Sequence, residues 1–370
     1  MTGETKVRSV ARIDLSAIRH NVGVLARTAA GARMLVVVKA NGYGHGAVAV
    51  ARAAIDAGAA QLGLAAVDEV EELRAAGIDA PMLMWGPLID DEWRRAAATG
   101  CEIAVWSPEG CVSAARAGIR RVHLKLDSGM GRLGARPDAV AELAQAARDS
   151  GVEVVGLMTH FATADERAGE NAGFMVEQLV RFRAMVAPLR AMFPQAIIHA
   201  ANSAATLRNP DTHLDMVRCG IAVYGCSPFM DDPADHDLRP AMTLASYLSS
   251  VKPILGRESV GYGRKWRAAR GSFIGAIPVG YADGYPRAYT NVASVLVGGR
   301  RVPVVGMVSM DQITVDLGPG AAERVGDEVV LLGAQGQERL LAEELGRWRD
   351  TINYEVTCAV GARFRRVWTP

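Results

Sequence analysis

The hydrophobic and polar positions of the chain follow two rhythms between Asp14 and about residue 225. Short apolar runs are separated by longer Ala-rich stretches in which apolar residues recur at helical spacing. The first pattern is typical of buried parallel strands and the second of amphipathic helices. The apolar runs are MLVVVKA, QLGLAAV, PMLMWG, EIAVW, VHLKLD, VVGLMTH, AIIHAANS and DMVRCGIAVYG. Eight such βα units predict an α/β fold with a closed (β/α)8 TIM barrel, and Asp14 is placed to cap the helix that begins at LSAIRHN.

The pattern changes at the polar segment SPFMDDPADHDLRP, which has the composition of a linker. Beyond it, runs rich in Val, Ile and Thr are divided by Gly and Pro and predict a smaller, mainly antiparallel β-domain. These runs are MTLASYLSSVKPI, GSFIGAIPVG, ASVLVGG, RRVPVVGMVSMDQITVDLG and DEVVLLG. We therefore expect a barrel over residues 8–237 and a β-domain over residues 238–370, with the first few residues as candidates for pairing with the β-domain.

The amino-acid composition mainly excludes classes of binding partner. The 41 Lys and Arg residues nearly balance the 40 Asp and Glu residues and are scattered, so we expect neither a nucleic-acid nor a membrane surface. The start of the chain lacks the apolar stretch of a signal peptide, which favours a cytoplasmic location. The cysteines are widely spaced without a CxxC pattern, and we expect reduced packing residues at Cys101, Cys111, Cys219, Cys226 and Cys358.

Polar residues that follow the apolar runs are the first candidates for chemistry, because such barrels carry their active sites at the C-terminal ends of the strands. This rule selects Lys39, Lys125, His160, Asn202, Ser203 and Arg218. Lys39 leaves the run VVVK, which would desolvate its ammonium group and favour the neutral, nucleophilic amine. A solvated lysine at a strand end is the ordinary alternative, but the Gly-rich ANGYGHG that follows favours a lysine that forms a Schiff base with an anionic carbonyl cofactor.

The stretch VVVKANGYGHG resembles the cofactor-lysine signature of the bacterial alanine racemase family. Further blocks resemble those of the family in the same order, and they are HLKLDSGMGRLG, GLMTHFATAD, HAANSAAT, RCGIAVYG, VGYG, GYADG, GMVSMDQ and TINYEV. Several blocks in one order are far more specific than any single block. The resemblance implies a pyridoxal-5'-phosphate-dependent isomerase that interconverts L-alanine and D-alanine and supplies D-alanine for peptidoglycan.

The resemblance also implies how the cofactor is bound. Lys39 would form the Schiff base, His160 would pack on the ring, and Arg132 would contact the phenolic oxygen and the substrate carboxylate. Arg218 would face the pyridine nitrogen, and because a guanidinium can only donate, that nitrogen would stay unprotonated and simple reprotonation would be favoured. The phosphate ligands would be Ser203, Gly220, Ile221 and Tyr354, with Tyr43 also at the cofactor.

Two catalytic bases on opposite faces of the substrate are implied in the same way. Lys39 would serve the D-enantiomer and Tyr262 the L-enantiomer, with His160 hydrogen-bonded to Tyr262. A tyrosine needs nearby positive charge to act as a base at neutral pH. Tyr262 would reach the barrel of a second subunit, so a homodimer would complete each active site.

The remaining implied residues support the site or narrow its entrance. Lys125 lies on the inward-pointing alternation of VHLKLD, and the family relieves its repulsion with Arg132 by carbamylation of the lysine. Met310 would lie near the substrate carboxylate, and it would come from the partner chain. Tyr354 would face Tyr262 and restrict the site to small side chains. The other entrance residues would be Tyr281, Arg287, Asp311 and Ile352.

Three alternative functions differ from this interpretation in the motifs they need. A broad-specificity racemase, or a serine or lysine racemase, would share most of these motifs. A non-catalytic pyridoxal-phosphate carrier would keep a residue like Lys39 but would lack a β-domain with VGYG and GMVSMDQ. A barrel-type decarboxylase would need a GGG phosphate loop and a Cys-Asp pair in its second domain, whereas Cys358 has no neighbouring aspartate.

Overall fold

The computed structural model describes residues 7–370. The chain forms two compact units, which are described separately. The barrel unit comprises residues 18–229 and 234–239, and the β unit comprises residues 230–233 and 240–370 together with the described residues up to Ala17. The domain limits of 8–237 and 238–370 stay a prediction.

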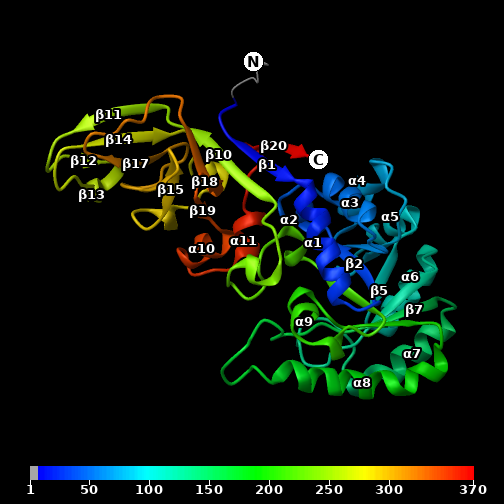
Figure 1. The fold of residues 1–370 in the computed structure, drawn as a ribbon. Helices are drawn as coiled ribbons and strands as arrows, with labels where there is room; N and C mark the ends of the chain where they lie inside the picture. Colours follow the sequence, from blue (N-terminus) through cyan, green and yellow to red (C-terminus); the bar gives the residue numbers. More distant parts are fainter. Residues whose placement is uncertain (1–6) are drawn as a thin grey trace. The chain divides into compact units, whose positions relative to one another are not determined.

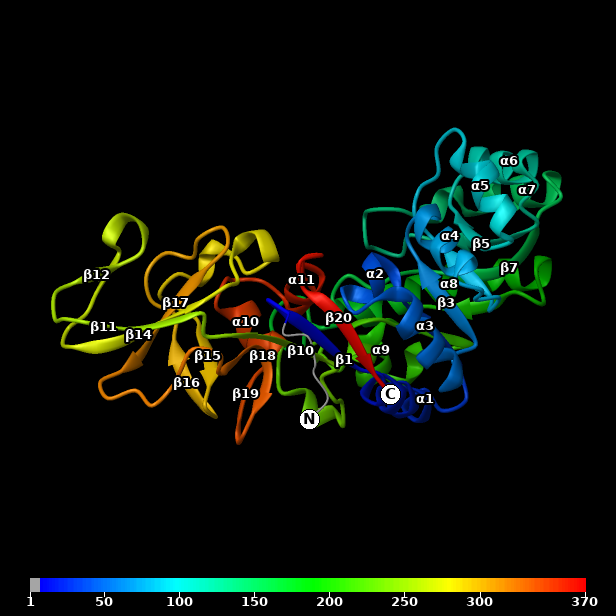
Figure 2. The ribbon, with the colours of Figure 1, turned by 90° about the horizontal axis from the view of Figure 1, so that it is seen from above.

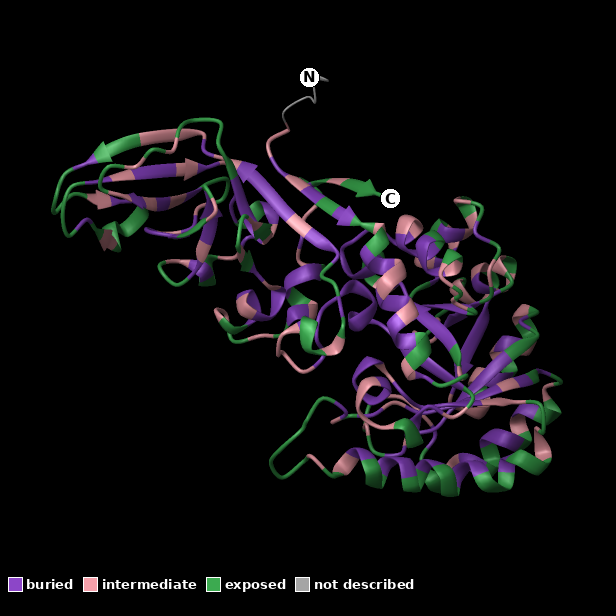
Figure 3. Ribbon diagram, in the orientation of Figure 1, coloured by how far each residue is buried: buried purple, intermediate pink, exposed green. Residues whose placement is uncertain are grey.

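The barrel unit has the predicted closed barrel of parallel strands, in which β9 pairs with β2 to complete the circle (Figure 1). Each predicted apolar run supplies one strand. The strands are β2 (Arg33–Val37), β3 (Gln61–Leu64), β4 (Met82–Met84), β5 (Glu102–Val105), β6 (Arg121–Lys125), β7 (Glu153–Met158), β8 (Ile197–His199) and β9 (Met216–Cys219). Nearly all strand residues are buried, because helices cover their outer face and side chains fill the interior (Figure 3).

Helix α1 (Leu15–Thr28) begins where the sequence predicts it. The carboxylate of Asp14 accepts hydrogen bonds from the backbone N–H groups of Ser16 (2.8 Å) and Ala17 (3.1 Å), so Asp14 caps α1 as expected. The helices are α1 (Leu15–Thr28), α2 (Lys39–Tyr43), α3 (Ala47–Asp56), α4 (Val67–Ala75), α5 (Glu92–Thr99), α6 (Pro108–Ala117), α7 (Val140–Asp149), α8 (Phe174–Met192) and α9 (Ser203–Arg208), with short 3-10 turns at Pro137–Ala139, Pro210–Thr212, Ile221–Tyr224 and Pro233–His236.

The β unit is mainly antiparallel, as predicted (Figure 2). A seven-stranded sheet has the order β16-β15-β18-β10-β1-β20 with β19 beside β18, and β11-β14-β17 and β12-β13 form smaller sheets. The strands are β1 (Val10–Asp14), β10 (Met242–Tyr247), β11 (Ser250–Ile254), β12 (Ser259–Val260), β13 (Trp266–Arg267), β14 (Ser272–Ile277), β15 (Ser294–Val297), β16 (Arg300–Pro303), β17 (Ile313–Gly318), β18 (Glu328–Gln335), β19 (Glu338–Leu340) and β20 (Arg365–Thr369). Helices α10 (Ala342–Arg347) and α11 (Asn353–Cys358) and 3-10 turns at Tyr262–Arg264, Tyr281–Asp283 and Arg287–Tyr289 complete the unit.

One cysteine corrects the prediction that all of them are packing residues. Cys101, Cys111, Cys219 and Cys226 are buried, whereas Cys358 is exposed. Cys358 is the last residue of the short helix α11. Within residues 7–370, no helix has both the length and the apolar character needed to span a membrane.

Candidate active site

Lys39 opens a left-handed turn directly after strand β2. Ala40, Asn41 and Gly42 have φ angles of 52°, 54° and 59°, and Tyr43 has a φ of 51°. A residue other than glycine costs about 1–2 kcal/mol in this conformation. Such a conformation persists only where its surroundings enforce it, and it is typical of functional sites.

Two acceptors enforce this turn. Glu69 on α4 accepts hydrogen bonds from the backbone N–H groups of Ala40 (2.6 Å) and Ala65 (2.8 Å), and the side chain of Asn41 accepts one from Ala47 (3.0 Å). Sequence reasoning missed Glu69, which lies in a helix far from Lys39 in the chain. The sequence signal for Glu69 was weak. It is a carboxylate in the first turn of α4, from which its side chain can reach the end of the neighbouring strand β2.

Tyr43 and Ser203 meet beside strand β9. The backbone N–H of Gly220 donates to the Ser203 hydroxyl (2.9 Å), and that of Ala222 approaches the same oxygen (3.4 Å). A Cβ atom at Gly220 would come within 2.5 Å of the Tyr43 hydroxyl. The predicted phosphate ligands of the barrel unit, Ser203, Gly220 and Ile221, therefore lie together with Tyr43, and Gly220 is needed for the close approach.

Four cations surround His160 at the C-terminal ends of the strands. Burial, followed by the charges of Arg218, Lys125, Arg132 and Lys39, lowers the pKa of His160 to about 3, so its ring is neutral at physiological pH. Burial, followed by the charges of Arg218 and Arg132, lowers the pKa of Lys125 to about 8. The site thus concentrates positive charge, which suits a ligand with several negative charges.

Arg218 is held by neutral acceptors. Its guanidinium donates to the carbonyl oxygens of Thr159 (2.6 Å) and Ala200 (3.0 Å) and to Nδ1 of His199 (3.1 Å), and it lies 3.4 Å from Nδ1 of His160. Burial lowers the pKa of Arg218 to about 10, so the group keeps its charge at neutral pH. A fixed guanidinium that can only donate therefore lies beside His160 on strand β9.

The other predicted site residues belong to the β unit. Tyr262 is 75% exposed between two glycines with φ angles of 73° and 68°. Tyr281, Met310 and Ile352 are also exposed. Arg287 lies in the 3-10 turn Arg287–Tyr289, and Tyr354 is half-buried in α11.

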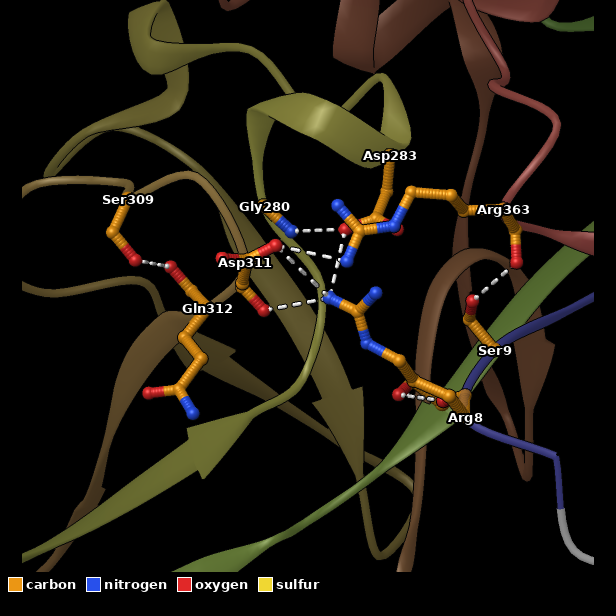
Figure 4. A network of polar contacts seen from close by, with 9 residues as sticks. Arg8, Ser9, Gly280, Asp283, Ser309, Asp311, Gln312 and Arg363 are labelled. Carbon is orange, nitrogen blue, oxygen red and sulfur yellow. Dashed lines mark hydrogen bonds and ion pairs between the residues drawn. The ribbon is translucent and has the colours of Figure 1, made fainter.

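A buried carboxylate, Asp283, lies in the turn Tyr281–Asp283, which is hydrogen-bonded to the separate loop that carries Met310 and Asp311 (Figure 4). Asp283 accepts a hydrogen bond from the backbone of Gly280 (2.8 Å) and pairs with Arg8 (3.2 Å) and Arg363 (3.1 Å). The same two arginines bind Asp311, through its carbonyl oxygen (2.9 Å) and its carboxylate (2.8 Å) respectively. The ends of the described chain thus fix the segment that bears Asp311.

Replacement of Asp283 with asparagine should lower the free energy of unfolding by about 3 kcal/mol, because two arginines would lose a fully buried partner. Asp311→Asn should cost less than about 1 kcal/mol, because that carboxylate is 56% exposed. Urea titration followed by circular dichroism measures both values. If both variants lost the same free energy of unfolding, burial of Asp283 would not be the source of the network's contribution to stability.

Comparison with known proteins decides the family. The model of the alanine racemase N-terminal domain matches residues 13–228, and that of the alanine racemase C-terminal domain matches residues 241–368. The chain belongs to the alanine racemase family. It is 45% identical over 365 residues to the alanine racemase of Symbiobacterium thermophilum, covering 97% of this chain and 96% of that protein.

Solved structures of alanine racemases agree with the fold. The enzyme from D-cycloserine-producing Streptomyces lavendulae superposes with a TM-score of 0.92 at 41% identity, covering 99% of this chain and 98% of that one. The biosynthetic enzyme from Pseudomonas aeruginosa gives a TM-score of 0.89 at 38% identity and covers 98% and 100% respectively.

Alanine racemases depend on pyridoxal phosphate, and the barrel residues fit that group. Lys39 supplies an amine at the strand end, and the Ser203 hydroxyl with the neighbouring backbone N–H groups of Gly220 and Ala222 offers donors that suit a phosphate. The cations around His160 suit the negative charges of the phosphate, the phenolic oxygen and a substrate carboxylate. The barrel residues therefore fit pyridoxal phosphate through the amine and the hydrogen-bond donors that they supply.

Proposed function

We propose that this chain interconverts L-alanine and D-alanine, supplying D-alanine for peptidoglycan, as an alanine racemase located in the cytoplasm. One observation carries the proposal: Lys39, Arg132 and Arg218 lie around a neutral His160 at the rim of a barrel from this family. The test is α-proton exchange of either enantiomer in D2O, followed by NMR, together with circular dichroism of the alanine pool. Exchange and a nearly equal mixture from either enantiomer are expected.

The cofactor, when bound, withdraws electrons from the α-carbon of a bound amino acid and so acidifies its α-proton. The amine of Lys39 would take or return that proton on one face, and the phenolic oxygen of Tyr262 would do so on the other. Arg132 and Met310 would hold the substrate carboxylate. Arg218, as a permanent donor, would keep the electron withdrawal modest, so that reprotonation is favoured over side reactions.

Tyr354, Tyr281, Arg287, Asp311 and Ile352 would narrow the entrance and so favour a small side chain. Broad-specificity, serine and lysine racemases, and a non-catalytic carrier, are not favoured by the comparisons. The same exchange experiment with serine and lysine separates them from an alanine racemase. If serine or lysine exchanged its α-proton faster than alanine, that amino acid would be the preferred substrate in place of alanine.

Lys125 is proposed to be carbamylated. Its lowered pKa of about 8 leaves a substantial fraction of the neutral amine near neutral pH. The amine nitrogen would attack CO2, form the N–C bond of a carbamate and release one proton to solvent. The new negative charge would face Arg218 and Arg132, whose repulsion of the ammonium it would remove.

Carbamylation should therefore increase as the pH rises through about 8, since deprotonation of a lysine with a lowered pKa supplies the nucleophile. The measurement is a 13C carbamate signal from 13C-labelled CO2 held at constant partial pressure between pH 7 and pH 9. Lys125→Arg should lose the signal, and the exposed-site control Lys252→Arg should keep it. A signal that persists in Lys125→Arg would contradict the assignment.

A further inference from the structure

A line of buried polar side chains runs through the barrel from Arg218 toward the opposite end. Nη1 of Arg218 on β9 lies 3.1 Å from Nδ1 of His199 on β8, and Nε2 of His199 lies 2.9 Å from Nδ1 of His123 on β6. Nε2 of His123 lies 2.9 Å from the carboxylate of Glu102 on β5. All four side chains are buried, which makes each of these contacts costly to break.

The chemistry of the two ends fixes the direction of every hydrogen bond. A guanidinium can only donate, so Nδ1 of His199 accepts. Neutral His199 then carries its proton on Nε2 and donates it to Nδ1 of His123. Neutral His123 in turn carries its proton on Nε2 and donates it to Glu102, and a carboxylate can only accept.

The charges agree with this arrangement. Burial, followed by the charge of Arg218, lowers the pKa of His199 well below its ordinary value, and burial also lowers that of His123 despite its contact with Glu102. Burial opposes ionisation of Glu102, but hydrogen bonds from His123 and Gln61 and the charge of Arg121 together lower its pKa. A carboxylate therefore stands at one end of two neutral imidazoles and a guanidinium at the other.

The far end of the line is the N-terminal mouth of the barrel. Glu102 is the first residue of β5, and it lines a pocket of about 320 Å³ with Gln61, Arg121 and Glu153, each of which begins another strand. Gly156 on β7 leaves space for the imidazole of His123, because a Cβ atom at this position would lie 2.0 Å from Nδ1 of His123. No other residue would allow His123 to keep its position.

We propose that Glu102, His123 and His199 are positioning residues that fix the orientation of Arg218 from the opposite end of the barrel. The carboxylate of Glu102, whose other oxygen pairs with Arg121 (3.0 Å), ends the line with a group that can only accept, and the two imidazoles transmit this direction to Arg218 as polarised hydrogen bonds. The inference deepens the proposed function. Its consequence for the cofactor rests on that function, whereas the orientation of Arg218 does not. With Glu102 neutral, the reversed tautomers become accessible, in which Nδ1 of His199 bears a proton and turns Arg218 away.

The first test is the tautomer of each ring, and it does not require racemase activity. In cofactor-loaded enzyme labelled with 15N-histidine, long-range 1H–15N correlation should show neutral His123 and His199, both protonated on Nε2. Single substitutions of each histidine by asparagine assign the signals. A proton on Nδ1 of either ring, or a doubly protonated ring, would overturn the inference.

The second test removes the charge while keeping an acceptor. In Glu102→Gln, 15N-labelled pyridoxal phosphate should show a shifted ring-nitrogen resonance, and the ratio of transamination to racemisation should rise roughly tenfold, equivalent to about one pKa unit at that nitrogen. The control is His213→Gln, which alters a buried histidine bonded to Thr206 outside the line and should leave both readouts unchanged.

The outcomes separate this inference from the proposed function. A folded Glu102→Gln enzyme with an unchanged ring-nitrogen resonance overturns the role of Glu102, even if racemisation of alanine is confirmed. A wild-type enzyme that leaves alanine unchanged overturns the racemase proposal, while the tautomers and the Glu102→Gln resonance still decide the inference. Equal changes in His213→Gln would show a general loss of stability and would also overturn it.

Discussion

Lys39→Ala is expected to lose racemisation of alanine in both directions by at least about 10³-fold, together with α-proton exchange of both enantiomers. The amine follows β2 directly and is the nucleophile that the site offers to a carbonyl cofactor. Its loss removes both the covalent attachment and one of the two proposed bases. Each direction of racemisation uses one base and the conjugate acid of the other, so neither direction should survive.

NMR in D2O measures exchange, and the absorption spectrum of the cofactor shows whether it is still bound. The matched control is Lys252→Ala, which removes an exposed lysine of β11 and should leave exchange unchanged. A Lys39→Ala enzyme that retains the cofactor and still exchanges D-alanine at the wild-type rate would remove Lys39 from the mechanism.

The sequence predicted the barrel because its signal is local and repeated. A strand buried on both faces is mostly apolar, so each of β2 to β9 is visible as an apolar run without reference to the others. The β unit is less regular. The run MTLASYLSSVKPI forms two strands of different sheets, since β10 pairs with β1 and β18 while β11 pairs with β14. Which sheet a strand joins depends on partners distant in sequence.

The site was predictable where a residue follows a strand end. Lys39, His160 and Ser203 all obey that rule, and the structure places them at the rim of one unit. The left-handed turn after Lys39 could not be predicted from propensity, because Ala40 and Tyr43 do not favour it; Glu69 and the packing around it impose it.

The buried line below Arg218 was missed for a different reason. His123 lies two residues before Lys125 on the same inward alternation, so the pattern did contain it. An isolated histidine in a strand is more often a packed core residue than part of a network. Only the closed barrel, which brings β5, β6, β8 and β9 to one axis, joins Glu102, His123 and His199 to Arg218.

Tyr262→Phe is expected to separate proton exchange from racemisation. Phenylalanine keeps the ring but has no hydroxyl, so the base proposed for L-alanine is lost while Lys39 remains. Exchange of L-alanine and racemisation in both directions should fall by about 10²- to 10⁴-fold. D-alanine should still incorporate deuterium with retention of configuration, because Lys39 can remove and return a proton on its own face. Equal loss of exchange from both enantiomers would contradict the two-base assignment.

A mixture of the two inactive variants tests where Tyr262 acts. If Lys39 and Tyr262 of one site come from different subunits, random reassociation of equal amounts of Lys39→Ala and Tyr262→Phe chains produces heterodimers with one intact site each. About a quarter of all sites would then carry both native bases, and activity should recover to that level. If both bases come from one chain, no combination restores a site and the mixture stays inactive. The shared site is the outcome that the family resemblance implies, and the 75% exposure of Tyr262 leaves its side chain accessible to a second chain.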